Sequence, residues 1–139
     1  MRQINWRLRL RSDPEKVFAL LATAEGRARF WAVEAPERDG SIHFRFADGT
    51  EEVSPIVRRE PPHLFELVYF GAPTRFLLAA DGKGGCELAL SASVPDGDYD
   101  EVNAGWVSVL LILKAAADFG IDLRNGEPGR TWREGFVDQ

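Results

Sequence analysis

Apolar residues recur at every second position in several short runs of the chain. The first run alternates over residues 4–10, and this two-residue period is typical of a strand with one dry face. Five further runs have strand character, over residues 42–46, 50–59, 64–70, 74–80 and 86–94. Turn residues such as Asp39-Gly40 and Asp48-Gly49 separate neighbouring runs, so the pattern predicts antiparallel hairpins. Pro55 removes a ladder donor, which predicts an edge strand or a bulge at that point.

Two short helices are expected directly after the first strand. Asp13 is a suitable cap and Pro14 suits the first helical position, where its missing N–H costs nothing. Thr23 restarts a second short helix, which closes at Trp31. Both helices precede the remaining strands in the sequence.

A third helical pattern near the C-terminus is the longest of the chain. It covers about 100–119 and ends before Gly120. Trp106, Leu110 and Leu113 have the spacing of one helical face. We therefore expect this face to be buried against the sheet.

The order of these elements predicts an α+β protein with one curved antiparallel sheet wrapped around the long C-terminal helix. At 139 residues the chain is expected to form a single domain, residues 1–139. The tail after Gly120 holds Trp132, Phe136 and Val137. Disordered tails seldom carry so much apolar surface, so we interpret this tail as an ordered arm packed on the body.

The charge of the chain limits its partners. A net charge of −5 argues against binding to nucleic acids or anionic membranes, although Arg7, Arg9 and Arg11 form a local basic stripe. The single cysteine, Cys86, favours a reducing, cytoplasmic compartment. The N-terminus lacks the apolar core of a signal peptide. The longest apolar run, 107–113, is too short to cross a bilayer, so we expect no membrane insertion.

No pattern in the sequence predicts a metal site, a cofactor or a catalytic nucleophile. His43 and His63 lack partners at a ligand spacing, and the acidic run 96–101 lacks the spacing of a calcium loop. Asp98 and Glu101 are better explained as a capping box for the long helix. The glycine-rich run 82–85 precedes a strand, whereas a phosphate loop precedes a helix.

Aromatic and aliphatic residues remain in excess on the predicted inner faces of the strands. Sheet parity places Phe44 with Phe46, Phe65 with Leu67 and Tyr69, and Phe76 with Leu78. We predict that they line an apolar cavity between the long helix and the sheet, with the tyrosine hydroxyl as a polar handle. The candidate ligand-binding residues are Trp31, Phe44, Phe46, Phe65, Leu67, Tyr69, Phe76, Leu78, Trp106, Leu110 and Leu113.

These pieces together resemble the SRPBCC, or START-like, superfamily with the helix-grip fold, and within it the C-terminal domain of the heat-shock-protein-90 ATPase activator. The matching residues are Ser12 to Phe18, Trp31, Gly40, Phe44, Phe46, Gly49, Val53, Ile56, Pro62, Leu64, Leu88, Leu90, Gly105, Trp106, Leu110, Leu113 and Gly120. One departure is Cys86, where such sequences commonly carry threonine after a glycine run.

The resemblance implies a hydrophobic-ligand pocket without choosing the ligand. We expect non-catalytic binding of a small apolar molecule, because the chain has many aromatics and no catalytic constellation. One alternative is a polyketide cyclase or hydratase, with Glu66, Tyr69 and Arg75 as the candidate polar groups. A surface cross-strand pair explains Glu66 and Arg75 equally well. The other alternative is a protein-interaction module, with a chaperone or a second copy of the chain as its partner.

Overall fold

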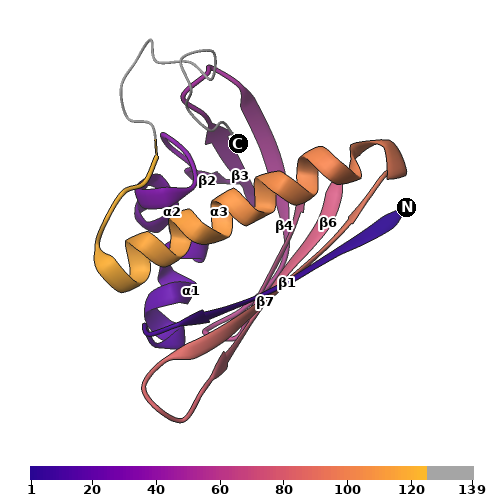
Figure 1. The fold of residues 1–139 in the computed structure, drawn as a ribbon. Helices are drawn as coiled ribbons and strands as arrows, with labels where there is room; N and C mark the ends of the chain where they lie inside the picture. Colours follow the sequence, from indigo (N-terminus) through magenta and orange to yellow (C-terminus); the bar gives the residue numbers. More distant parts are fainter. Residues whose placement is uncertain (125–139) are drawn as a thin grey trace.

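The computed structural model describes residues 1–124, which form one seven-stranded sheet and three α-helices (Figure 1). The strands lie in the order β1-β7-β6-β5-β4-β3-β2, and every neighbouring pair is antiparallel. Their bounds are β1 Arg2–Leu10, β2 Glu37–Arg38, β3 Ser41–Arg45, β4 Glu51–Glu60, β5 Leu64–Tyr69, β6 Ala72–Ala80 and β7 Cys86–Val94. The short strand β2 is the one that the alternation of the sequence does not predict.

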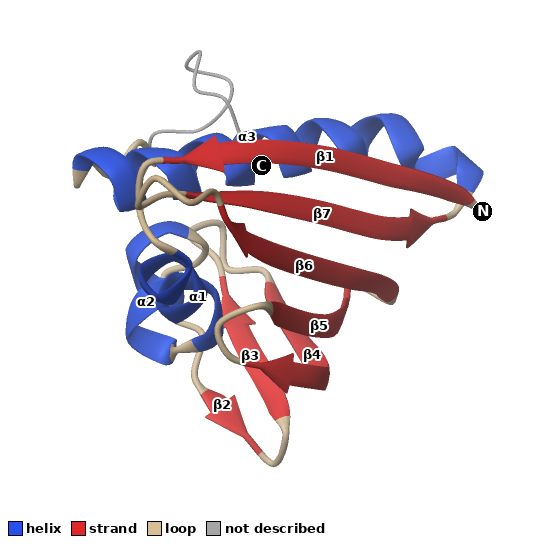
Figure 2. Cartoon of the chain, turned by 90° about the horizontal axis from the view of Figure 1, so that it is seen from below, coloured by secondary structure: helices blue, strands red, loops and turns tan. Residues whose placement is uncertain are grey.

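The helices lie on one face of this curved sheet. α1 (Pro14–Ala22) and α2 (Ala24–Phe30) cover one end, and α3 (Tyr99–Phe119) runs along the strands (Figures 1 and 2). The predicted α+β class, with a sheet wrapped around a long C-terminal helix, is confirmed. The predicted cap at Asp13 forms, since its side chain accepts from the Lys16 amide. Thr23, at the predicted start of the second helix, also caps it by accepting from the Gly26 amide.

The start of α3 differs from the prediction. Asp98 precedes the helix, but its side chain makes no capping hydrogen bond, so the predicted capping box with Glu101 is wrong. A 3-10 turn over Asp96–Asp98 leads directly into α3 and holds the Asp98 backbone in a helical conformation. A capping side chain normally needs an extended backbone at this position. The other end of α3 closes as expected, with Gly120 in the left-handed region.

Strand β4 and the β5–β6 turn have local irregularities in the sheet. β4 is an interior strand, and its register shifts between Ile56 and Arg58, so a bulge accommodates the strand that carries Pro55. The turn between β5 and β6 consists of Phe70 and Gly71, one step earlier than the predicted turn. Both have positive φ, 47° and 75°, as a tight two-residue hairpin requires.

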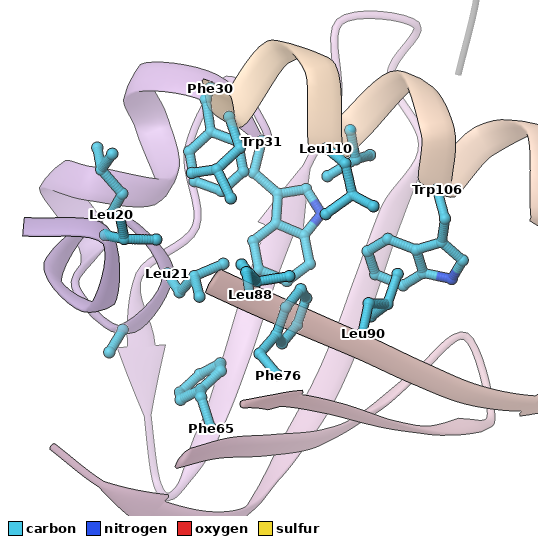
Figure 3. Close-up of a cluster of buried hydrophobic side chains, with 14 of the residues drawn as sticks. Leu20, Leu21, Phe30, Trp31, Phe65, Phe76, Leu88, Leu90, Trp106 and Leu110 are labelled. Atoms are coloured by element: carbon cyan, nitrogen blue, oxygen red, sulfur yellow. The ribbon is translucent and has the colours of Figure 1, made fainter. Parts of the chain in front are cut away.

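The core lies between the helices and the inner face of the sheet (Figure 3). Phe65, Phe76 and Leu88 are buried there from three neighbouring strands, while α3 contributes Trp106 and Leu113. Trp6 departs from its predicted dry position, with 38% of its surface exposed at the edge strand β1. Its indole N–H donates to Asn103 Oδ1 at 2.9 Å, so it tethers β1 to α3. The predicted arm with Trp132, Phe136 and Val137 lies outside the described residues.

Candidate functional site

Trp31 is the centre of an aromatic cluster between α3 and the inner face of the sheet. It follows the last residue of α2 and is almost completely buried. Its ring centroid lies 4.9 Å from Phe44, 5.4 Å from Tyr69 and 5.7 Å from Phe76. Trp106 from α3 completes the cluster at 6.2 Å (Figure 3). Side chains from strands β3, β5 and β6 and from helix α3 thus meet at the indole that follows α2.

The cluster continues from Trp31 to the surface. Phe46 stacks on Phe44 at 5.8 Å, and Phe70 stacks on Phe46 at 6.0 Å. Phe70 is also 4.8 Å from Tyr69 and is 52% exposed. We call this group, Trp31, Phe44, Phe46, Tyr69, Phe70 and Trp106, the aromatic end of the grip. It lies where the β3–β4 hairpin, the β5–β6 turn and the first half of α3 come together.

Tyr69 supplies a polar group inside this apolar wall. Its hydroxyl oxygen accepts a hydrogen bond from Trp31 Nε1 at 3.2 Å. Burial raises the pKa of Tyr69 far above its ordinary value, so the hydroxyl keeps its proton. No group in residues 1–124 accepts that proton. The Tyr69 O–H is therefore available to an acceptor on a bound molecule.

Ser54 is a second polar group on the same wall, and the sequence analysis missed it. It is 0% exposed, and its hydroxyl has no hydrogen-bond partner among the described residues. Ser54 lies opposite Ile42, and Ile56, two residues further on, lies opposite Leu67, so all four share the inner face. Buried hydroxyls are almost always paired, which makes this one exceptional.

The structure brings the predicted site residues together on the helix-facing side of the sheet. All belong to the core or pack against it, and Phe46 and Tyr69 are the two that stay partly exposed. The parity chosen for β5 is correct, because Phe65 and Leu67 are buried while Phe70 is exposed. The alternation of residues along β4, counted back from Ile56, predicts that Ser54 lies on the inner face. Alternation does not predict the position of Phe70, which depends on the β5–β6 turn.

Two hollows of the described residues lie away from the predicted cavity. They measure about 420 Å³ and about 240 Å³. The larger one is bounded by the end of β1, the β6–β7 turn and α3, and the smaller one lies over the outer face of the sheet. Between α3 and the inner face, the rings of the aromatic cluster contact one another instead. Side chains therefore occupy much of the space in which the sequence predicts a cavity.

The polar residues considered for catalysis are not brought together. Glu66 and Arg75 pair across β5 and β6 on the outer face, with Oε1 2.6 Å from Nε, whereas Tyr69 faces the core. They form the surface cross-strand pair that was the alternative explanation. Within residues 1–124, no three His, Cys, Asp or Glu side chains gather in a metal-binding arrangement. Cys86 is buried, and burial is the main cause that raises the pKa of its thiol, to about 11.

Solved structures share this architecture at low sequence identity. Protein SSP2350 from Staphylococcus saprophyticus matches with a TM-score of 0.78 and 21% identity, over 88% of this chain and 96% of its own. The Aha1 dimer from Colwellia psychrerythraea gives 0.76 and 22%, over 86% and 98%. DynU16, from the dynemicin biosynthetic locus, gives 0.70 and 18%, over 93% of this chain and 49% of its own. No protein-family profile and no curated protein sequence matches the chain.

These similarities establish an α+β helix-grip fold, and identities this low establish the fold alone. By length and composition, the helical stretch Asp96–Phe119 is apolar enough to cross a membrane. In this fold Trp106, Leu110 and Leu113 of that stretch are buried against the core. A core helix meets the same length and composition criteria.

Proposed function

We propose that the protein is a non-catalytic binder of a small apolar molecule, which it holds at the aromatic end of the grip. The proposal extends the resemblance to the START-like superfamily from fold to function. The observation that carries it is a pair of hydroxyls on this wall. Ser54 is buried without a partner, and the partly buried Tyr69 has no acceptor for its proton within residues 1–124. Apolar sites with a few polar groups are typical of small-molecule binding.

The chemistry of the wall defines the class of ligand. Flat rings surround Trp31 at distances that favour stacked and edge-on contacts, so a planar aromatic or unsaturated molecule fits best. An oxygen on that molecule would accept from Tyr69 and pair with Ser54. In a core without a ligand, the unpaired hydroxyl of Ser54 would cost free energy.

The rings of Phe46 and Phe70 cover the place at which a ligand would enter. Both lie at the exposed end of the cluster, and they stack on each other at 6.0 Å. Phe70 belongs to the two-residue turn between β5 and β6, and about half of its surface is exposed. Rotation of these two rings would expose Tyr69 and Phe44 without moving the sheet.

Titration with 1-naphthol, an uncharged aromatic alcohol, tests the proposal. We expect saturable binding with a shift of the Trp31 indole N–H resonance in ¹H–¹⁵N spectra. Ser54→Ala and Tyr69→Phe should each weaken binding by about five- to tenfold, because each removes a hydrogen bond to the ligand worth about 1–1.4 kcal/mol.

Ser91→Ala is the matched control, since this serine lies on the outer face of the sheet and should bind as wild type does. Absence of saturable binding to wild type, or equal affinity in all three variants, would overturn the proposal.

A second candidate function is self-association through α3. From Val102 to Leu113 the helix carries no charged residue, and Leu111 is 54% exposed. An uncharged, exposed helical face is typical of a protein–protein contact. The structural neighbour from Colwellia psychrerythraea is a dimer, which supports the same interpretation for this chain. A chaperone partner and a cytoplasmic location stay predictions from the sequence.

Sedimentation velocity separates this candidate from the first. A dimer at about 100 µM that Leu111→Lys converts to a monomer would support self-association, since apolar burial drives such contacts. Val57→Lys, at an exposed apolar residue of β4, is the control and should not change the sedimentation coefficient. A monomeric wild type would exclude this candidate and leave the binding proposal intact.

A further inference from the structure

The hollow of about 420 Å³ is lined mainly by positive charge. Its lining residues are Arg9, Leu10, Arg11, Asp81, Lys83, Gly85 and Lys114. Four of them are cationic and one is anionic, in a chain whose net charge is −5. Such a volume holds a small ligand of several heavy atoms. The concentration of cations at one concave position is therefore unusual for this surface.

Hydrogen bonds hold the three segments that form this hollow. In the β6–β7 turn, Asp81 Oδ1 accepts from the backbone amides of Lys83 and Gly85, at 2.7 and 3.0 Å. At the end of β1, the amides of Arg11 and Ser12 donate to the buried carboxylate of Asp118, at 2.9 and 3.0 Å. The turn lies beside the end of β1 in Figure 2. These bonds fix the backbone that carries Arg11 and Lys83 before any ligand arrives, so binding orders only their side chains.

Lys114 is the best fixed of the four cations. Its Nζ donates to the carbonyl of Arg9 at 2.7 Å and to Asp118 Oδ2 at 2.9 Å. An ammonium group has three donors, so one remains for a ligand. The guanidinium of Arg11 lies 4.3 Å from the ring centroid of Phe119, which supports its position by a cation–π contact.

Three of these cations have no carboxylate partner. Within residues 1–124, no ion pair involves Arg9, Arg11 or Lys83, whereas Arg7 on the same strand pairs with Glu87 at 2.7 Å. Asp118 is neutralised by Lys114, which leaves Asp81 as the one lining carboxylate. Guanidinium and ammonium donors that outnumber the carboxylates of a hollow are suited to an oxyanion.

We propose that this hollow binds a phosphate group, either free or as the head of a phosphomonoester. A phosphate dianion matches the excess positive charge, and its oxygens suit the forked donors of Arg9 and Arg11. The volume exceeds that of phosphate alone, so a small organic part can follow it into the hollow. The site is separate from the aromatic end, because β6 runs from Ala72 near Tyr69 to the turn at Asp81.

Chemical-shift titration of the full chain tests the site with three probes. These are inorganic phosphate, glycerol 3-phosphate, and vesicles of phosphatidylcholine with phosphatidic acid. We expect saturable shifts of the Lys83, Gly84 and Gly85 amides with the soluble probes, and weaker affinity at higher salt. Tight binding to the vesicles alone would assign a lipid head group as the source of the phosphate.

Arg11→Gln and Lys83→Gln should each weaken phosphate binding by about tenfold, since each removes a charge-assisted contact. Arg7→Gln is the matched control on β1 and should bind as wild type does, because Arg7 does not line the hollow. Unchanged melting temperatures would show that the variants fold. No saturable shift with any probe, or equal affinity in Arg11→Gln and Arg7→Gln, contradicts the proposal, whatever the result with 1-naphthol.

Discussion

Arg27 shows how a charged residue can be part of the core. It is 0% exposed, and its guanidinium donates to the carbonyl of Ala35 through Nε and Nη2, at 3.0 and 2.7 Å, and to Leu21 through Nη1 at 3.2 Å. Burial lowers the pKa of Arg27 to about 10, so it stays cationic at neutral pH. The side chain thereby ties the C-terminal end of α1 to the loop before β2.

Arg27→Lys should lower the free energy of unfolding by about 2 kcal/mol, because an ammonium group cannot reproduce the forked contact. Chemical denaturation measures this change. Arg29→Lys, at an exposed position of the same helix, is the control and should stay within about 0.5 kcal/mol of wild type. An equally small effect at Arg27 would mean that the buried fork contributes little to stability.

Asp118 predicts a pH dependence of stability. Burial by itself would raise the pKa of this carboxyl, but donors from Arg11, Lys114 and Ser12 outweigh it and hold the pKa well below the ordinary 3.8. The folded state therefore binds the proton less tightly than the unfolded state. The resulting stability is present above the unfolded pKa and is lost as the pH falls toward the folded pKa.

Asp118→Asn should lower the free energy of unfolding by about 2 kcal/mol or more at pH 7, since charged hydrogen bonds are lost. The difference from wild type should shrink below about pH 4, where the unfolded carboxyl becomes protonated. Urea denaturation at several pH values measures it. A difference that stays constant down to about pH 2 would contradict the assigned cause.

At the scale of the helices, two glycines have opposite roles. A Cβ on Gly26 of α2 would lie 2.2 Å from the Ala19 carbonyl oxygen of α1, so only glycine allows the two helices to pack this closely. Gly105 in α3 has no atom within 4 Å of its ideal Cβ position. Gly105 therefore weakens its helix without any packing reason in the described residues.

Gly26→Ala should destabilise the protein by about 2 kcal/mol or more through steric overlap, although alanine is the better helix former. Gly105→Ala should stabilise it by about 0.5–1 kcal/mol through the helix propensity of alanine. Thermal unfolding of both variants tests the pair. The packing argument fails if both variants change the melting temperature in the same direction.

At the scale of the whole molecule, hydrophobic periodicity was enough to predict the fold. A period of two assigns Phe65 and Leu67 to the core and Glu66 to the surface, and the structure agrees. The sequence could not show whether the space inside the grip is empty, because this depends on side-chain rotamers and on the distance between the layers. Nor could the sequence single out Ser54, because the lack of a hydrogen-bond partner for its hydroxyl is visible only in the folded structure.

The packing of α3 on the sheet should dominate the global stability. Trp106 is 3% exposed and contacts rings from three other elements. Trp106→Ala should therefore cost about 3–5 kcal/mol, as expected for a large residue of a filled core. Chemical denaturation measures this loss. A loss below about 1 kcal/mol, together with loss of 1-naphthol binding, would instead place Trp106 at the border of an open cavity.

The most direct test of the binding proposal is to locate bound 1-naphthol by intermolecular nuclear Overhauser effects. The proposal predicts contacts from the probe to ring protons of Trp31, Tyr69 and Trp106, with further contacts to Phe46 or Phe70 at the entrance. Contacts restricted to Val57 and Pro73 would place the probe in the hollow on the outer face of the sheet. That result, or the absence of any contact at saturating probe, would contradict a ligand site at the aromatic end of the grip.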